Sequence, residues 1–323
     1  MVEVTIFTHF SIARWPLVNK MSGIAKCLNV DLIHCPKIEL LKQALTNVKT
    51  KKVLLLTDDG MIDYILALDK EVFDFELEIA VFIQQKLSKF AEKINQLSRV
   101  RYLLEFDEKD AFVGRHLAIL VKKVKDNNIL DLNKYLGFGA AIQSKTVNSK
   151  SSKQSAVEEI SFFIENLGDP KHANPFKEYA RRITEMVDEL IINAIFGANP
   201  RMKDADRSED FRLGKEEEVY LSWGYDGEYF GVSVRDMFGQ FSVESIMQHL
   251  SMKPEFENIV QSKSAGLGQK LVVERAHQII TNVQVKKITE VIAIVKFENR
   301  LLDYERTKKS FFYFTEGNGA IFN

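Results

Sequence analysis

The sequence predicts an α/β domain followed by an α+β domain, and three observations carry that prediction. In residues 1–125, short apolar runs alternate five times with segments of helical periodicity. A polar stretch rich in serine and lysine, residues 143–154, then interrupts the apolar pattern. After it, helical segments cluster with consecutive strand-like runs, which is typical of helices packed on a largely antiparallel sheet.

The first domain, residues 1–125, reads as five strand–helix pairs. Its strand-like runs are short and mostly apolar, at 4–7, 30–35, 53–57, 79–83 and 101–106. The helical segments that follow them are 16–28, 38–45, 61–68, 86–97 and 111–124. Continuous apolar strands separated by helices predict a parallel sheet that is covered on both faces.

Residues 126–150 are predicted to be a connecting segment, because residues 143–154 show no apolar periodicity. The second domain, residues 151–323, is predicted to be a two-layer sandwich of helices on a sheet. The expected helices are 156–167, 175–195, 243–250 and 267–278, and the expected strands are 219–223, 229–235, 283–286, 291–297 and 310–314. The tail from residue 307 carries four phenylalanines and is expected either to close the sheet or to form a dimer contact.

The composition excludes several classes of protein. The chain has 44 Lys and Arg against 45 Asp and Glu, so no overall basic field exists and direct nucleic-acid binding is not expected. Two cysteines, Cys27 and Cys35, cannot build a disulfide scaffold and lack zinc-like spacing. The start has no signal-peptide pattern, and no run approaches the ~18 apolar residues of a membrane helix. We therefore expect a cytoplasmic protein with no membrane partner.

The helix expected at 175–195 carries the first motif. Apolar residues at positions i, i+3, i+4 and i+7 from Val187 predict a buried face, while Glu185, Glu189 and Asn193 form a separate polar stripe. Asparagine is unfavourable inside a helix because its side chain competes for backbone hydrogen bonds. An amide oxygen can ligate a hydrated Mg²⁺, and a carboxylate one turn earlier can order a water or accept a proton. Alone, the pattern is also typical of a solvated polar stripe.

A second motif ends the strand expected at 229–235. Asp236 stands at the strand end and Gly239 allows a turn. A carboxylate in this position can accept a hydrogen bond from the exocyclic amine of an adenine. An Asp that simply starts a turn is the common alternative.

The third motif is a pair of glycines, Gly266 and Gly268, placed before an expected helix. Glycines let backbone N–H groups approach phosphate oxygens, and a helix N-terminus favours their negative charge. A flexible loop with turn glycines has the same sequence pattern.

The order and spacing of the three motifs, with Thr-Glu-Val at 289–291 behind them, resemble the GHKL ATPase superfamily, whose domains have the Bergerat fold. The resemblance covers about residues 150–300. It is closest to the anti-sigma-factor serine kinases, because of the Thr-Glu-Val in the penultimate expected strand, and extends to the ATPase domain of histidine kinases.

The resemblance implies a site for ATP and Mg²⁺. Glu189 would be the catalytic carboxylate, and Asn193 would ligate the Mg²⁺ that bridges the phosphates. The residues implied to contact the nucleotide are Asn193, Asp236, Gly239, Gly266, Gly268 and Thr289, with residues 240–265 as a lid. The chain departs from the family at Phe238 and Gln269, where a glycine and a leucine are usual.

The first domain resembles a response-regulator receiver, which has a flavodoxin-like fold, in topology and length. Asp58 follows the third expected strand, where a receiver carries its phospho-acceptor. Thr8 and His9 replace the acidic pair that holds Mg²⁺, and Gln84 and Glu105 replace two further receiver residues. We expect a degenerate receiver used for docking or dimerisation. Residues 58–60 also encode a turn.

The leading functional hypothesis is a bacterial-type signalling protein that binds Mg-ATP and phosphorylates or sequesters a protein partner, such as a sigma factor or an anti-anti-sigma-like regulator. One alternative is a non-catalytic module whose partner surface is gated by ATP. Another is an atypical histidine kinase that lacks a dimerisation domain, since His172 lies between Pro170 and Pro175 and not in a long helical pattern. A homodimer is compatible with each.

Overall fold

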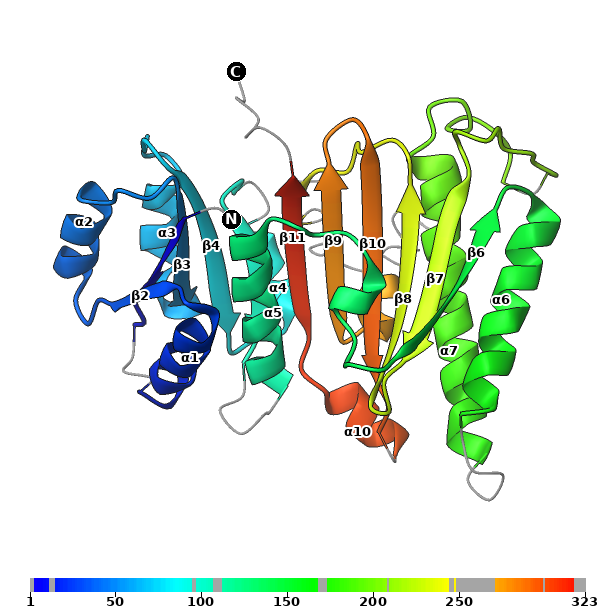
Figure 1. The fold of residues 1–323 in the computed structure, drawn as a ribbon, viewed down its shortest axis with the longest axis horizontal. Helices are drawn as coiled ribbons and strands as arrows, with labels where there is room; N and C mark the ends of the chain where they lie inside the picture. Colours follow the sequence, from blue (N-terminus) through cyan, green and yellow to red (C-terminus); the bar gives the residue numbers. More distant parts are fainter. Residues whose placement is uncertain are drawn as a thin grey trace. The chain divides into compact units, whose positions relative to one another are not determined.

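The chain is an α/β protein that divides into two units (Figure 1). The computed structural model describes residues 3–11, 15–94, 97–106, 112–167, 173–207, 209–243, 247, 271–298 and 300–316. The first unit comprises residues 1–129, 243–251 and 308–323, and the second comprises residues 130–242 and 252–307.

The first unit contains the five strand–helix pairs that the sequence predicts. Its strands are β1 (Val4–Thr8), β2 (Asp31–His34), β3 (Lys52–Asp58), β4 (Glu76–Ile83) and β5 (Val100–Glu105). Its helices are α1 (Trp15–Leu28), α2 (Ile38–Thr46), α3 (Ile62–Leu68), α4 (Leu87–Ile94) and α5 (Phe112–Asp126). The strands are parallel in the order β2-β1-β3-β4-β5, which is the order of flavodoxin-like sheets.

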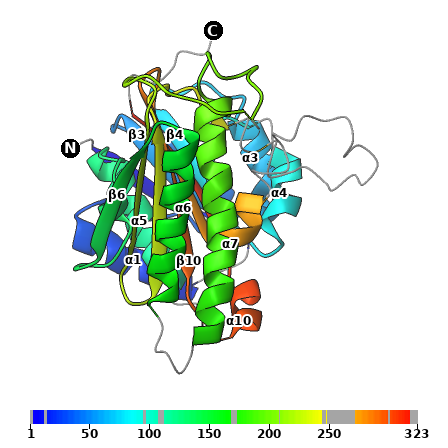
Figure 2. The ribbon, with the colours of Figure 1, turned by 90° about the vertical axis from the view of Figure 1, so that its right-hand side faces the viewer.

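Helices cover both faces of this sheet: α1 and α5 lie on one face, and α3 and α4 on the other (Figures 1 and 2). Every residue of β3 is buried for that reason. The predicted parallel sheet is confirmed.

The tail adds a sixth strand, β11 (Ser310–Glu316), which runs antiparallel to β5. Phe312 lies opposite Tyr102 in the register, and their rings meet edge to face with centroids 5.8 Å apart. Of the two roles expected for the tail, residues 310–316 therefore close a sheet, but it is the sheet of the first unit.

A buried carboxylate links three strands of the first unit to β11. Glu78 is almost fully buried, lies 3.1 Å from Lys52 Nζ and 2.6 Å from Arg101 Nη1, and accepts a hydrogen bond of 2.8 Å from the Tyr102 hydroxyl. Arg101 also donates to Thr315 of β11. Burial opposes ionisation of Glu78, but the two cations and the hydroxyl hold its pKa below the ordinary value.

We expect Glu78→Gln to lower the free energy of unfolding by about 2 kcal/mol at pH 7, because glutamine keeps the shape but leaves Lys52 and Arg101 with only the partly exposed carboxylate of Glu76 as a counter-charge. A lowered pKa in the folded state stabilises the fold above the unfolded pKa, and this contribution is lost as pH falls. Urea unfolding from pH 6 down to pH 2 should therefore show a steeper loss of stability in the wild type than in the variant, with the difference arising below about pH 4.5, the ordinary pKa of a glutamate. Parallel curves would contradict the assignment.

The second unit is an antiparallel sheet with two helices on one face (Figure 2). Its strands are β6 (Ala141–Val147), β7 (Val219–Tyr225), β8 (Tyr229–Asp236), β9 (Gln278–Gln284) and β10 (Ile288–Lys296), in the order β9-β10-β8-β7-β6. The helices are α6 (Lys150–Glu165), α7 (Ala173–Ile192) and the short α10 (Leu301–Arg306).

The connecting segment predicted at 126–150 is wrong for residues 141–150. They include β6 and the first residue of α6, which also contains the serine-rich residues 151–154. β6 is an edge strand whose first four residues are exposed, so its sequence lacks the alternation of apolar and polar residues from which a strand is predicted. The serines of this stretch are helix-start residues: the Ser149 and Ser152 side chains form a reciprocal capping box.

Residues 130–136 also belong to the second unit and cover the other face of its sheet. Leu132 and Leu136 pack against Gly231 of β8, where an added Cβ would lie 2.8 Å and 3.1 Å from their methyl groups.

A second difference from the sequence prediction lies at residue 278, where β9 begins and a helix was expected to end. Residues 271–275 are helical.

Candidate functional site

The polar stripe of α7 ends in an irregular turn. The α-helix stops at Ile192, and residues Asn193–Gly197 form a π-turn in which Ala198 N–H donates to the Asn193 carbonyl at 3.0 Å. Such widened turns occur frequently at functional sites. The Asn193 side chain is half-buried and makes no hydrogen bond to any residue that the structure describes. Its amide is therefore available to a ligand.

Glu189, one turn before Asn193, is half-buried, and its Oε2 atom is buried without a hydrogen-bond partner among the described residues. The pKa of Glu189 is raised, mainly because the side chain is buried. The nearby cations Arg207 and Lys153 act to lower this pKa, and the nearby carboxylate of Asp188 acts to raise it. A carboxylate of raised pKa and with a free oxygen is suited to accept a proton or to hold a water molecule.

Asp236 is the last residue of β8 and is only 5% exposed. It accepts a hydrogen bond of 2.9 Å from the Phe238 N–H. Burial raises the pKa of Asp236 to about 6, although the N–H groups of Phe238, Gly239 and Thr289 favour the ionised form. At neutral pH the side chain is a buried hydrogen-bond acceptor.

Thr289 lies directly opposite Asp236 in the β8–β10 pair. Its buried hydroxyl has no hydrogen-bond partner of good geometry among the described residues, although it is near enough to lower the pKa of Asp236. Opposite residues of paired strands point to the same face, so these two polar groups form one buried spot. A buried hydroxyl that makes no hydrogen bond of good geometry is costly unless a ligand or water also binds it.

This polar spot lies on the face of the sheet that the helices cover. Phe230 contacts Phe163 of α6 with ring centroids 6.3 Å apart, and Asp236 follows Phe230 by an even number of residues along β8. Its neighbour Arg235 points to the opposite face, where it pairs with Glu290.

Gly239 shapes the chain after Asp236. Its φ of +60° is in the left-handed region, and its carbonyl accepts a hydrogen bond of 3.0 Å from Lys286 N–H in the β9–β10 turn. An added Cβ would lie 2.2 Å from the Gln284 carbonyl oxygen, so only glycine fits. The structure thus places Gly239 against a neighbouring turn. Phe238 is not among the residues of positive φ.

The helical residues 271–275 lie beside the polar stripe of α7, because Arg275 Nη2 is 3.2 Å from Glu185 Oε2. The glycines that precede this segment, Gly266 and Gly268, lie outside the described residues, as does most of the expected lid at 240–265.

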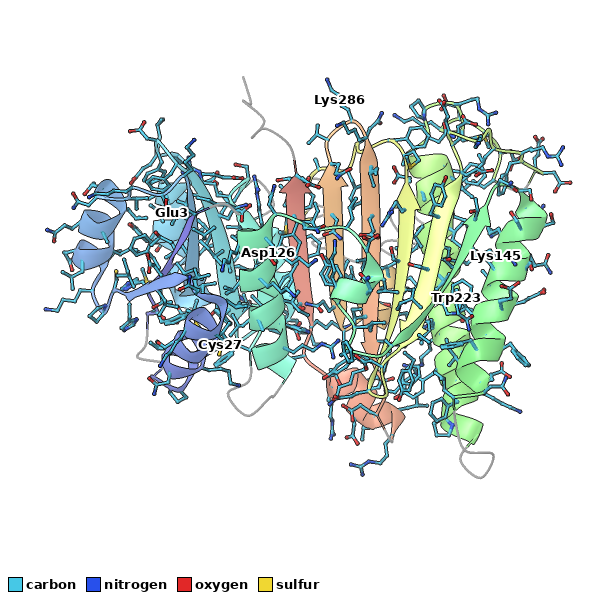
Figure 3. The ribbon with its side chains drawn as sticks, in the orientation of Figure 1. Glu3, Cys27, Asp126, Lys145, Trp223 and Lys286 are labelled. Carbon is cyan, nitrogen blue, oxygen red and sulfur yellow. The ribbon has the colours of Figure 1, made fainter. Side chains whose placement is uncertain are left out.

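These elements meet at one end of the second unit. The end of α7, the end of β8 and the turn between β9 and β10 lie at the same end in both ribbon views, and Figure 3 labels Lys286 in that turn. The π-turn packs against β8. Asn193, Asp236 and Thr289, which are far apart in the sequence, are therefore brought to one end of the sheet.

Glu290 anchors the strands behind the site and is a residue whose role sequence reasoning missed. It is fully buried on the opposite face of the sheet. Its carboxylate accepts hydrogen bonds from Ser233 (2.7 Å), Arg235 (2.9 Å), Asn282 (2.9 Å) and the Asp131 backbone N–H (3.0 Å). These bonds fix β8, β9 and β10 in register, which positions Asp236 and Thr289.

The candidate phospho-acceptor of the first unit, Asp58, is completely buried at the end of β3. Its Oδ1 atom accepts hydrogen bonds of 3.2 Å from the backbone N–H groups of Ser11 and Gly60. Of the residues that replace the acidic pair, Thr8 contacts His34 at 2.9 Å and His9 donates to the Cys35 carbonyl at 2.7 Å. The position of Asp58 is that of a structural cap.

Among the described residues, no group of three or more His, Cys, Asp or Glu side chains is placed to hold a metal. None of the described helices combines the length and the apolar character needed to cross a membrane. No protein-family model matches the chain, and no curated protein does.

Proposed function

We propose that the second unit binds ATP with Mg²⁺ and that the protein uses it to phosphorylate or sequester a regulatory protein partner. One observation carries the proposal: the buried carboxylate of Asp236 and the hydroxyl of Thr289 form a polar spot beside the end of α7, which bears Glu189 and Asn193.

The polar spot fits a purine that carries an exocyclic amine. The ionised Asp236 would accept a hydrogen bond from that amine, and the Thr289 hydroxyl would satisfy a ring nitrogen directly or through water. Guanine presents a carbonyl oxygen at the position of the adenine amine, so the ionised carboxylate would disfavour it. The proposed site would therefore prefer adenine to guanine.

The end of α7 fits a hydrated magnesium ion. Mg²⁺ is usually held by one or two protein oxygens together with phosphates and water. Asn193 would supply an amide oxygen, and Glu189 would hold a water of the ion or the attacking hydroxyl. When bound, the ion would neutralise charge on the phosphates.

In the proposed transfer, a serine or threonine hydroxyl of the partner attacks the terminal phosphorus of ATP. The bond between that phosphorus and the bridging oxygen breaks, ADP leaves, and the hydroxyl proton passes to Glu189. The raised pKa of Glu189 suits this role. Gly266 and Gly268 would contribute backbone N–H groups to the phosphates.

The first unit is proposed to dock partners as a degenerate receiver, because Asp58 is buried and caps a turn. A non-catalytic, ATP-gated module is the second candidate. It is favoured by Gly239, which packs against the β9–β10 turn and does not lie free to contact phosphates.

The two candidates differ in the effect of Glu189→Ala. With radiolabelled ATP and a panel of sigma-factor regulators, a kinase should lose transfer to its partner at least about 100-fold, with ATP affinity changed less than about threefold. Glu165→Ala, which removes an exposed carboxylate of α6, is the matched control. ATP binding without transfer in the wild type would favour the module, and absence of an ATP-induced thermal shift would overturn both.

A further inference from the structure

The outer edge of β6 is open. β6 pairs with β7 along residues 141–147, and none of the described strands pairs with its other edge (Figures 1 and 2). Such an edge presents unpaired backbone N–H and C=O groups and is a template for another strand. This feature is independent of the nucleotide site.

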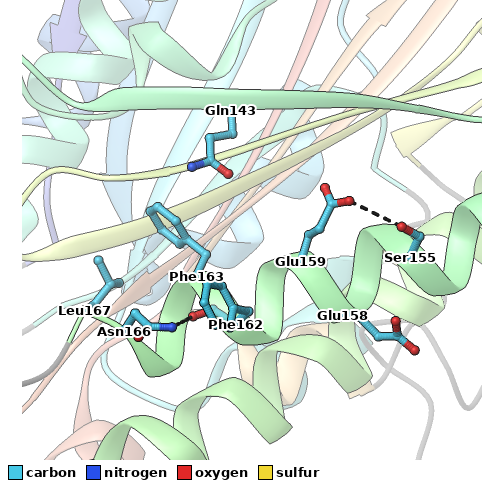
Figure 4. Close-up of a pocket in the computed structure, with 8 residues that line it drawn as sticks. All are labelled: Gln143, Ser155, Glu158, Glu159, Phe162, Phe163, Asn166 and Leu167. Carbon is cyan, nitrogen blue, oxygen red and sulfur yellow. Dashed lines mark hydrogen bonds between the residues drawn. The ribbon is translucent and has the colours of Figure 1, made fainter. Parts of the chain in front are cut away.

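A groove lies beside this edge, between β6 and α6 (Figure 4). Its volume is about 590 Å³, and Gln143 of β6 faces Glu159 and Phe163 of α6 across it. Phe162, which also lines the groove, is 73% exposed. Phe163 and Leu167 line the same groove, so the exposed Phe162 belongs to a contiguous apolar surface beside an open strand edge, which is typical of an interaction site.

Proteins protect such edges with a lysine that extends into solvent, and β6 carries Lys145. Here the lysine does not extend outward, because its ammonium bonds Ser155 and Glu159 of α6 and its side chain is 24% exposed. Figure 3 labels Lys145 beside α6. The edge is therefore left accessible.

We propose that a second copy of this chain occupies the edge, with the two β6 strands antiparallel about a two-fold axis at Ser144. In this register Ser144 lies opposite its own counterpart, and Gln143 lies opposite the partner's Lys145. The two five-stranded sheets then join into one, and the two α6 helices run antiparallel beside each other.

Charge favours a second copy as the occupant. Gln143 and Lys145 both lie on the α6 face of β6, so the partner's Lys145, which its own Glu159 holds in place, lies at the rim of a groove that also carries Glu158, an exposed carboxylate with no ion pair among the described residues. The two-fold axis makes each contact twice.

Helix α6 is complementary to itself in the same arrangement. Its first turn carries the exposed Lys150, and its second half carries two exposed glutamates, Glu158 and Glu165, whereas Lys153 is paired with Asp188 of α7 and Glu159 with Lys145. Antiparallel helices bring the basic start of each copy toward the acidic end of the other. The exposed Phe162 becomes covered in this contact.

Sedimentation of the full chain between about 1 and 200 µM tests the surface. We expect a dimer whose dissociation constant rises at least tenfold in Phe162→Asp and is unchanged in Leu302→Asp, which places the same charge on an exposed residue of α10. A wild type that stays monomeric at 200 µM, or a dimer equally weakened by both variants, overturns the proposal.

Cross-linking tests the register in a Cys27→Ser background, which removes the exposed native cysteine. Opposite residues of an antiparallel pair have Cα atoms about 4.5–5.5 Å apart, so Ser144→Cys should form a disulfide-linked dimer on oxidation. Ile142→Cys alone should not, because the two copies of this residue are about 13 Å apart in this register. The double variant Ile142→Cys/Thr146→Cys should again form a disulfide-linked dimer, because residue 142 of one copy lies opposite residue 146 of the other in this register. Linkage of the Ile142→Cys single variant, or none for Ser144→Cys, contradicts the register.

Discussion

Asp236→Asn is expected to lower the affinity for ATP about 100-fold and to bring the affinities for ATP and GTP close together. The wild-type carboxylate accepts a hydrogen bond and offers no donor, so it discriminates between an amine and a carbonyl oxygen on the purine. The asparagine amide offers both a hydrogen-bond donor and an acceptor, so it can bind either purine. The variant should fold normally. Burial already disfavours the ionised form of Asp236, so a neutral side chain of the same shape is tolerated at this position.

The same residue predicts a pH dependence. Since the pKa of Asp236 is raised to about 6, the acceptor is present above that pH and is lost as pH falls through it. Wild-type ATP affinity, measured by calorimetry from pH 8 to pH 5, should decline below about pH 6, and Asp236→Asn should show no such decline. Asp210→Asn, at an exposed aspartate, is the control. An unchanged ATP-to-GTP ratio in Asp236→Asn would refute the base-reading role.

Asn193→Ala is expected to abolish the Mg²⁺-dependent part of ATP binding. The amide of Asn193 makes no hydrogen bond to the described residues, so its removal breaks no internal contact and should leave the thermal stability within about 1 °C. Calorimetry with and without Mg²⁺ should show the metal strengthening ATP binding in the wild type and having no effect in the variant.

A second substitution separates ligation from packing. Asn193→Asp retains an oxygen ligand of similar size, so it should keep part of the Mg²⁺ dependence that alanine loses. Equal Mg²⁺ dependence in the wild type and in Asn193→Ala would remove the metal role of this residue and leave the purine site untouched.

The first sheet could be predicted because its strands are buried on both faces and read as continuous apolar runs, such as Val53–Thr57. β6 was missed because an edge strand that is exposed on one side carries polar residues. The start of β9 was misplaced because Gln278–Gln284 is buried and apolar enough to extend a helical pattern.

Helical periodicity indicated Glu189 and Asn193, since residues four apart share a face. It could not indicate the π-turn at Asn193, which depends on the packing of α7 against β8. The pairing of Asp236 with Thr289 and the bond from Ser233 to Glu290 depend on the register of β8 with β10, which joins residues more than fifty positions apart. Asp58 was placed correctly at the end of β3, but its burial is set by the loop that carries Ser11.

The return of β11 to the first unit has a consequence for biosynthesis. Ser310 leaves the ribosome 205 residues after Glu105, a delay of roughly 10–40 s at 5–20 residues per second. Throughout that interval the nascent first unit has a bare β5 edge, and the Glu78 cluster lacks its Thr315 contact. Chains whose synthesis stops early should therefore be the form of this protein most prone to aggregate or to need chaperones.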